Sequence, residues 1–338
     1  MTKKRTIWSL SIVGIIAVVL IVVFAFGSIN RADKKSNSDT IRLGIMTNSD
    51  GQYLATIAQN QGYFKKYGVK VKTSTFSSGI ETVNALTTNQ LDIGYVADFA
   101  ALNRFGSAGK NDLKIFAKLS SSGGSSTKLF SNRNIKSLAD LKGKGIVTNK
   151  GTVVDYWIDK ALDKAGLKES DVKILPVESG QETLALLQSG KASAAWGFAQ
   201  DAQKLAQSGK YKVLATQGQI ASPTLAFAIS NQQFLKDHPK AAEGYLKSIN
   251  ASVQFVKANP QKAAQIIHSD TKIPEETVLA TFKSVNFKIN LDQNTLSSLN
   301  NIYQYLADNG KLKNKYRVKD YLDTSILKKA IPNATIYK

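Results

Sequence analysis

Two stretches of the chain repeat one pattern of residues that could bind a ligand. SSGIETVNALTTNQLDIGYVAD begins at Ser77, and ESGQETLALLQSGKASAAWGFA begins at Glu178. Both contain Ser-Gly-x-Glu-Thr, then a leucine, a small polar turn and an apolar run that ends near an aromatic residue, Tyr95 or Trp196. Hydroxyls, backbone N–H groups and aromatic rings are the groups that line small-molecule sites. Both stretches are therefore candidate ligand-binding segments.

Residues typical of catalysis are sparse. The chain has no cysteine, and its two histidines, His238 and His268, lie in lysine-flanked segments of helical character. No Ser-His-Asp pattern and no metal-ligand spacing is present in the sequence. We therefore expect no enzymatic activity, no metal site and no cofactor.

The repeated motif has a physical interpretation. In each copy a strand ends, Ser-Gly permits a tight turn, and a helix begins with Glu in its first turn, where the helix dipole favours an acid. Such turns lie at the carboxyl ends of strands, which is where open α/β sheets bind ligands. If two such units face each other, their loops form opposite walls of one cleft. Alternatively, the motif is only a favourable strand-to-helix connection that was duplicated.

The elements around these motifs alternate between β-branched runs and helical stretches. The first series is a strand at 41–46, a helix at 53–68 closed by Gly68, a strand at 69–76, a helix at 79–89, and strands at 91–98 and 113–120. The second is a helix at 153–166, a strand at 172–177, a helix at 181–190, a strand at 192–198, a helix at 200–209 and a strand at 211–216. This order predicts α/β units with mostly parallel sheets and right-handed crossovers.

The N-terminal segment has the features of an export signal or a membrane anchor. Residues 1–6 are basic and are expected to stay in the cytoplasm, whereas 7–27 are uncharged and long enough to cross a bilayer. Residues 28–40 are charged and rich in Ser and Asn, as in a solvated linker. We expect the protein at the extracellular face of the cell membrane, anchored by this helix, or secreted if it is cleaved after Gly27.

The net charge of +20 raises the question of a nucleic-acid partner. The lysines, however, are scattered over presumed helix faces without the aromatic interleaving of nucleic-acid binding surfaces. Solvated faces attracted to anionic lipid or cell wall are the better interpretation, and we expect no nucleic acid as partner.

Several further stretches carry a family resemblance. IKSLADLKGKGIVTNKGTVVDYWIDKALDKAGLKESDVKI, from Ile135, resembles the S-x-x-D-L-K-G-K … L-x-x-A-G-L-x-x-x-D-V region of the type II periplasmic-binding-protein superfamily. The chain is similar in particular to the nitrate/sulfonate/taurine branch of ABC-importer substrate-binding proteins, which includes aliphatic-sulfonate-binding and thiamine-precursor-binding members. Further matches are IRLGIM, AQNQGYFKKYGVKVK, ALTTNQLDIGYV, ISNQQFLKDHPKAAEGYLKSI and FVKANPQKAAQII. Together they extend from Ile41 to about Ile267.

The resemblance implies a two-lobed α/β fold with a ligand cleft between the lobes. Lobe 1 would hold residues 41–122 and 218–338, and lobe 2 would hold 123–217. Members of the family act without catalysis: they trap a small solute by lobe closure, as monomers, and deliver it to an ABC permease and its ATPase subunits.

The expected cleft residues lie at the strand ends of both lobes. From lobe 1 they are Asn48, Gln52, Tyr53, Ser78, Gly79, Tyr95, Asp98 and Phe99. From lobe 2 they are Gly151, Thr152, Val153, Glu178, Ser179, Trp196 and Phe198. Tyr95 and Trp196 occupy corresponding positions and could clamp a ligand, or each could be a core aromatic. Asp98 and Glu178 could face the ligand or pair with surface lysines.

The ligand class is less constrained. Where the family often has Trp-Asp-Pro, this chain has Trp196-Gly197-Phe198, which removes a carboxylate. The expected wall offers no clear Arg for a sulfonate or nitrate, although helix N-termini can bind an anion. Asp98 and Glu178 would suit an amine or amidine. An alkanesulfonate or a taurine-like zwitterion fits this mixture, and the alternatives are a thiamine-precursor aminopyrimidine or an enzyme on the same scaffold.

Overall fold

The structure is a computed structural model that describes residues 40–47, 49–107, 112–124, 127–150, 152–197, 199–221 and 223–338. Three of the expected cleft residues, Asn48, Gly151 and Phe198, lie outside the described residues. The predicted basic segment 1–6, the predicted membrane helix 7–27 and nearly all of the linker also lie outside them. Within the described part of the chain, no helix combines the length and apolar character needed to cross a bilayer.

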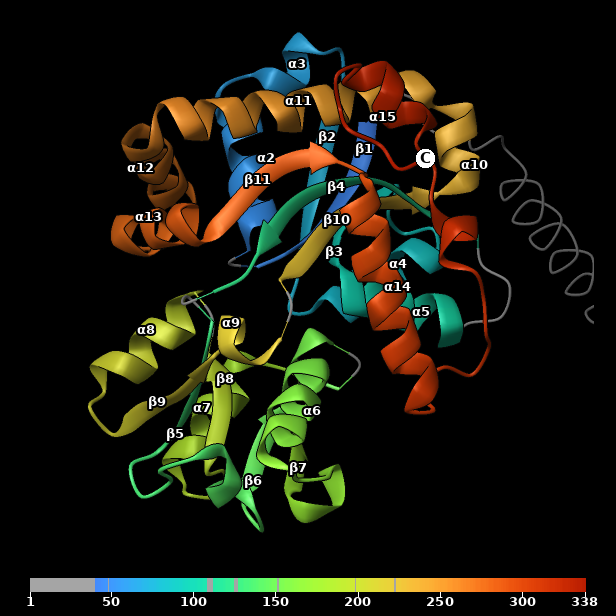
Figure 1. Ribbon diagram of the computed structural model, residues 1–338. Coiled ribbons are helices and arrows are strands. Elements are labelled where there is room, and N and C mark those ends of the chain that lie inside the picture. The colour runs from blue at the N-terminus through green and yellow to red at the C-terminus, as the bar shows by residue number, and fades with distance from the viewer. Residues whose placement is uncertain are drawn as a thin grey trace, which may run out of the picture. The chain divides into compact units, whose positions relative to one another are not determined.

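The first of two sheets contains six strands, all within the described residues (Figure 1). Their order is β11 (Val285–Asn290), β4 (Leu113–Ser122), β10 (Thr224–Asn231), β3 (Ile93–Ala97), β1 (Thr40–Met46) and β2 (Lys70–Phe76). Strand β1 pairs in parallel with β2 and β3, as the alternating sequence pattern predicts. Strand β10 is inserted between β3 and β4 and is antiparallel to both. Strand β11 is antiparallel to β4.

The second sheet has five strands and the same plan. Its order is β7 (Lys173–Pro176), β6 (Gly145–Thr148), β8 (Ala194–Gly197), β5 (Lys128–Asn132) and β9 (Tyr211–Thr216). Strand β6 pairs in parallel with β7 and β8. Strand β5 is antiparallel to both of its neighbours, β8 and β9.

The prediction of mostly parallel sheets is wrong for the inserted strands. The chain passes directly from β4 into β5 and from β9, through the short helix α9 (Gln217–Ile220), into β10. A strand that enters a sheet by such a short crossing starts at the edge where the parallel strands end, so it runs in the opposite direction. Each sheet is therefore mixed. In the first sheet β1, β2, β3 and β4 run in one direction and β10 and β11 in the other, and in the second β6, β7, β8 and β9 run in one direction and β5 in the other.

The helices agree with the sequence pattern in type, with two differences. The helix expected at 53–68 is divided into α2 (Asp50–Asn60) and α3 (Tyr63–Lys66), because Gly62 adopts φ 67° between them. Gly68, with φ 72°, ends α3 as expected. Helix α5 (Asp98–Ser107) was not expected and follows β3 directly.

The remaining helices flank the two sheets. Those of the repeated units are α4 (Gly79–Thr87), α6 (Val153–Ala165), α7 (Gly180–Gln188) and α8 (Ala199–Gln207). Those of the C-terminal part are α10 (Gln232–Asp237), α11 (Pro239–Ala258), α12 (Pro260–Thr271), α13 (Glu275–Ser284), α14 (Gln293–Asp308) and α15 (Ser325–Ala330). Short 3₁₀ turns are η1 (Leu138–Leu141), η2 (Glu169–Asp171) and η3 (Val318–Tyr321).

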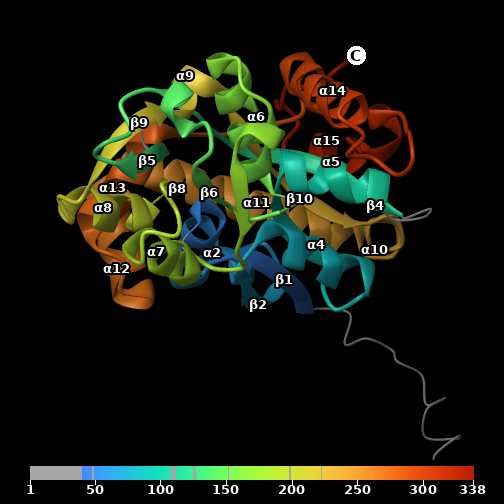
Figure 2. The ribbon, with the colours of Figure 1, turned by 90° about the horizontal axis from the view of Figure 1, so that it is seen from below.

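The cores differ in size. One large apolar cluster surrounds the first sheet and includes residues of α2, α4, α5, α11 and α14. The second sheet has two smaller clusters, one of which contains Trp157 and Trp196. Helices that flank the two sheets are also in contact with each other: α6 contacts α5, and α8 contacts α13 (Figure 2).

Candidate ligand-binding cleft

A cavity of about 1,050 Å³ lies between the two sheets, at the carboxyl ends of their parallel strands. Eight of the fifteen expected cleft residues line it. From the part of the chain that forms the first sheet these are Ser78, Gly79 and Tyr95, and from the second they are Thr152, Val153, Glu178, Ser179 and Trp196. The two repeated motifs therefore lie on the same cavity, one on each side.

Both motifs form the same helix cap. Ser78 accepts a hydrogen bond from the Glu81 N–H at 3.4 Å, and Ser179 accepts one from the Glu182 N–H at 3.3 Å. In return, the carboxylate of each glutamate accepts the N–H of the residue before the serine, at 3.0 Å in α4 and 2.9 Å in α7. Such reciprocal caps satisfy N–H groups that a helix start leaves unpaired. The capping role explains the motif's residues without a ligand.

Four expected cleft residues do not line the cavity, and their placement is a correction. Helix α2 begins three residues earlier than expected, so Tyr53 lies in its core-facing part, fully buried beside Phe282 with ring centroids 6.3 Å apart. Gln52 belongs to the same helix and its N–H donates to the capping Ser49. Phe99 is fully buried in the unexpected helix α5.

Asp98 is not among the residues that line the cavity, and within the described part of the chain it forms no ion pair with a lysine. It is 1% exposed, and its carboxylate accepts the N–H of Phe99 and the N–H of Leu225, each at 2.8 Å. Leu225 is the second residue of β10, just after the chain returns from the second sheet. Burial raises the pKa of Asp98 to about 7. This acid holds the returning strand to the start of α5.

The floor of the cavity contains Asp50, an acid that is not among the expected cleft residues. The Asp50 carboxylate oxygen Oδ2 accepts hydrogen bonds from the Tyr95 hydroxyl at 2.6 Å and from the Ser120 hydroxyl at 2.5 Å. Burial raises the pKa of Asp50, and burial together with the nearby Asp50 charge raises the pKa of Tyr95. Asp50 is the first residue of α2, next to the expected cleft residues Asn48, Gln52 and Tyr53. Its position directly after Ser49, which caps the helix, is the sequence signal that could have identified it.

Two tryptophans share one wall. Trp196 on β8 is 4% exposed and Trp157 on α6 is 5% exposed, with ring centroids 5.2 Å apart. Both line the cavity and both belong to the core of the second sheet. Within the described part of the chain, neither indole N–H has a hydrogen-bond partner. Trp157 could have been found by its spacing, since it lies one helical turn after Val153.

The charges of the lining contrast with the basic chain. Four carboxylates line the cavity, those of Asp50, Glu178, Asp201 and Glu276. Among the described lining residues the basic ones are two lysines, Lys128 and Lys204, and no arginine or histidine is included. The cavity is therefore more acidic than the rest of a protein whose net charge is +20.

Side-chain contacts join the two halves on both flanks of the cavity. On one flank, Gln203 of α8 hydrogen-bonds Glu276 and Thr277 of α13. On the other, Asp159 of α6 accepts a hydrogen bond from Tyr305 and forms an ion pair with Lys311 at 3.0 Å. These contacts pair residues of 123–217 with residues of the C-terminal part.

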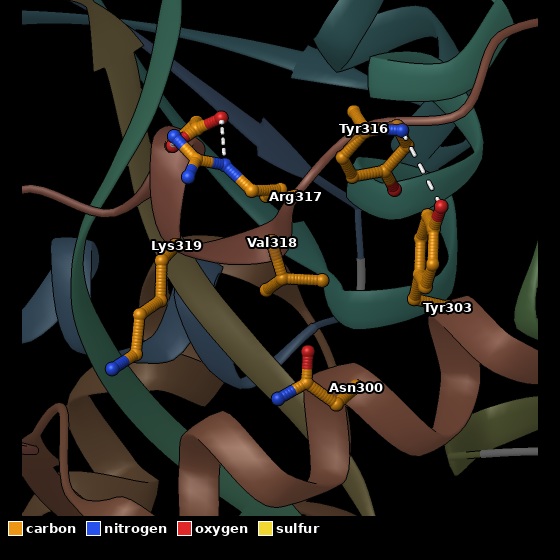
Figure 3. A pocket seen from close by; sticks show the side chains of 7 residues that line it. Asn300, Tyr303, Tyr316, Arg317, Val318 and Lys319 are labelled. Carbon is orange, nitrogen blue, oxygen red and sulfur yellow. Dashed lines mark hydrogen bonds and ion pairs between the residues drawn. The ribbon is translucent and has the colours of Figure 1, made fainter.

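A second cavity, of about 570 Å³, lies between α14 and η3 (Figure 3). Its lining residues are Asn300, Tyr303, Tyr316, Arg317, Val318, Lys319 and Asp320. Within it, the Tyr316 N–H donates to the Tyr303 hydroxyl at 3.3 Å, and Arg317 pairs with Asp320 at 2.8 Å. It contains none of the expected cleft residues.

Solved structures with this fold align with most of the chain. The alkanesulfonate-binding protein SsuA from Xanthomonas axonopodis pv. citri, bound to MOPS, superimposes with a TM-score of 0.73 at 16% identity, over 84% of this chain and 98% of that one. The nitrate-binding protein NrtA from Synechocystis gives a TM-score of 0.69 at 17% identity, over 87% and 88%. A DszB mutant in complex with biphenyl-2-sulfinic acid gives 0.69 at 15% identity, over 87% and 99%. The chain thus has the periplasmic-binding-protein fold.

Proteins similar in sequence are named as binding proteins. One from Brucella abortus is 28% identical over 291 residues, which is 83% of this chain and 89% of the relative. One from Bacillus subtilis, assigned by name to aliphatic sulfonates, is 25% identical over 86% of this chain and 88% of the relative. The taurine-binding periplasmic protein of Escherichia coli is 27% identical over 61% of this chain and 64% of its own length.

The model of the NMT1-like family matches residues 34–268. The matched range includes both repeated motifs, the whole second sheet and every strand of the first sheet except β11. The family resemblance to sulfonate-, taurine- and nitrate-binding proteins is confirmed by these comparisons. The chain belongs to the NMT1-like family.

Proposed function

We propose that this protein is the extracellular solute-binding component of an ABC importer, which captures a small organic anion or zwitterion of the alkanesulfonate or taurine type. The observation that carries the proposal is the cavity between the two sheets, to which both repeated motifs contribute. A solute in such a cavity contacts both halves at once. The names of the relatives, which include aliphatic sulfonates and taurine, support the ligand class.

Capture would proceed by closure of two lobes, 41–122 with 218–338 and 123–217, about the crossings β4 to β5 and β9 to β10. A ligand drives closure only as far as it binds the closed form more tightly than the open form. The ligand contacts made from both walls, by Ser78 and Tyr95 on one side and by Ser179 and Trp196 on the other, would supply that difference.

The anionic end of the ligand would be held by helix N-termini and lysines. Helices α4, α6 and α7 all begin at the cavity, where their N-termini favour an anion. Lys128 and Lys204 add positive charge to the lining. Hydroxyls of Ser122, Thr127 and Thr224, which also line the cavity, can donate to sulfonate oxygens.

An aminopyrimidine is the second candidate ligand. The acidic lining and the pair of tryptophans favour it, because a flat aminated ring can stack on indole and donate hydrogen bonds to carboxylates. Binding without catalysis is supported by the names of the relatives in sequence. We further propose that residues 7–27 hold the protein at the membrane, beside the permease and its ATPase subunits.

A thermal-shift screen of the full chain in detergent tests the proposal. The probes are taurine, ethanesulfonate, nitrate and 4-amino-2-methylpyrimidine, with sodium chloride at equal ionic strength as control. A ligand at a hundred times its Kd adds about 2.7 kcal/mol of stability. We expect at least one organic probe to raise the Tm. If none does, the solute-binding proposal is wrong.

A further inference from the structure

Asp50 is held in a fixed orientation at the floor of the cavity. Its Oδ2 accepts both the Tyr95 and the Ser120 hydroxyl, and the two hydroxyl oxygens lie 2.8 Å apart. These three side chains come from α2, β3 and β4, so three separate elements fix one carboxylate. Side chains locked by such bonds form preorganised binding groups.

The first turn of α2 is shaped for this arrangement. A Cβ atom on Gly51 would lie 2.5 Å from Cγ of Tyr95, which is closer than two carbon atoms that are not bonded to each other can approach. Only glycine therefore lets the Tyr95 ring pack on the helix start, with its hydroxyl on Asp50. Tyr95 itself is 6% exposed, so the ring belongs to the support of the site.

Among the described residues, no ion pair compensates the Asp50 charge. Within the described part of the chain, none of the ion pairs of Lys or Arg involves Asp50, although the chain carries 45 such residues. Removing a carboxylate from water is unfavourable unless a positive charge or hydrogen bonds replace the lost solvation. The two hydroxyls replace part of it, and burial still raises the pKa of Asp50.

The other charges of the cavity reinforce this preference. Glu178, Asp201 and Glu276 line the same space, against Lys128 and Lys204. Several negative charges that face one cavity repel an anion and attract a cation. This effect grows where water is excluded. The anion expected from the relatives' names therefore needs a positive group elsewhere on the same molecule.

From this geometry we infer that Asp50, oriented by Tyr95 and Ser120, is the subsite for a protonated amine or an amidine-like group of the solute. The inference rests on the proposed function and narrows it. The captured solute carries an N–H donor, either a protonated amine or the amino group of an amidine-like ring, and a simple alkanesulfonate or nitrate lacks such a donor. An aliphatic amine of taurine type and the amino group of an aminopyrimidine share this chemistry.

Isothermal titration of the full chain with matched probe pairs tests the inference. The pairs are taurine with ethanesulfonate, and 4-amino-2-methylpyrimidine with 2-methylpyrimidine; the members of each pair differ in the amino group. We expect one amino probe to bind at least about tenfold more tightly than its partner, as loss of a charged hydrogen bond implies. The pair that shows this difference identifies the source of the amine.

Variants connect the difference to Asp50. In Asp50→Asn the affinity for the amino probe should fall at least about tenfold, because a charge-assisted bond is lost, while its partner changes little. Ser120→Ala, which keeps the carboxylate and loosens it, should give a smaller loss. Asp308→Asn makes the same change of charge at an exposed position, the last residue of α14, and should leave both affinities as in the wild type.

The outcomes separate this inference from the proposed function. Equal affinities within both probe pairs, or an Asp50→Asn variant that is folded and keeps the wild-type preference, would overturn the amine subsite and leave solute binding intact. If Asp50→Asn does not fold, the wild-type probe pairs still decide. Absence of binding by all four probes would overturn the proposed function and the subsite together.

Discussion

The two copies of the repeated motif show how far equal sequence leads to equal structure. The capping serines have nearly the same backbone angles, φ −145° and ψ 158° at Ser78 and φ −141° and ψ 158° at Ser179. The turns after the two helices are left-handed at corresponding positions, Asn89 with φ 56° and Gly190 with φ 73°. Helices α5 and α8 also start at corresponding residues. Local geometry is thus duplicated.

The surroundings of the two copies are different. Helix α4 buries Thr82, Val83, Ala85 and Leu86 against β1, β3, β10 and α5, whereas α7 buries Leu187 and packs mainly on β8. The first copy is enclosed because α4 packs on several strands of its sheet and on α5. The comparison shows that the motif determines the cap, and the neighbouring elements determine how deeply the copy is buried.

The corresponding aromatics differ in the same way. The Tyr95 hydroxyl is bonded to Asp50 and lies 2.8 Å from the Ser120 hydroxyl, whereas the Trp196 N–H has no partner in the described residues and its ring packs on Trp157. One position anchors a polar network, and the other belongs to an apolar core that also borders the cavity.

Trp196→Ala should produce the largest effect. Because Trp196 is 4% exposed and packed in a small core, its truncation is expected to lower the free energy of unfolding by about 3–5 kcal/mol. Urea denaturation at fixed pH measures it. A loss below about 1 kcal/mol would mean that the residue is mainly a cleft residue and not a core aromatic.

Asp98 should make stability depend on pH, whereas the corresponding Ala199 cannot. Burial raises the Asp98 pKa from 3.8 to about 7, so the folded protein keeps a proton that the unfolded chain loses. This contribution to stability is complete below the unfolded pKa and decreases as the pH rises toward the folded value. Between pH 5 and 8 it should fall by about 2–3 kcal/mol.

Urea denaturation of wild type and Asp98→Asn at pH 5 and pH 8 isolates this contribution. The variant removes the titrating group, so its change between the two pH values should be smaller than that of the wild type by the same amount. Identical pH dependences would show that Asp98 remains ionised in the folded protein throughout this range.

Tyr95→Phe should have an intermediate effect. The change removes a hydroxyl donor to the Asp50 carboxylate and keeps the ring, so it is expected to cost about 1.5–3 kcal/mol of stability. It should also raise the pKa of Asp50 further, since one stabilising hydrogen bond to the charged form is lost. NMR titration of the aspartate carboxyl carbons measures the second effect. An unchanged Asp50 pKa would contradict the network.

The capping serines should give the smallest and most comparable effects. Ser78→Ala and Ser179→Ala each remove one helix cap, at a cost of about 1 kcal/mol. Ser78 is 8% exposed and its helix is more buried, so its loss should be the larger of the two. Thermal unfolding of both single variants and of the double variant measures this. A larger loss of stability in Ser179→Ala than in Ser78→Ala would contradict the expectation that burial increases the effect.

Sequence alone identified the elements that depend on neighbours in the chain. The strand and helix alternation, the helix starts after Ser78 and Ser179 and the family resemblance all come from local patterns, and the structure or the comparisons confirm them. Local patterns suffice here because a cap is made by residues within one helical turn.

Tertiary structure alone decided which side chains meet. Asp50, Tyr95 and Ser120 lie on three elements that are distant in sequence, and no spacing along the chain predicts that they are in contact. From the sequence, Asp98 was expected to be a cleft acid. In the structure its carboxylate instead accepts the Leu225 N–H of the returning strand β10. The inserted strands β5 and β10 likewise owe their direction to the crossings between the sheets. These features depend on contacts between segments far apart in the chain, which periodicity and motif spacing do not encode.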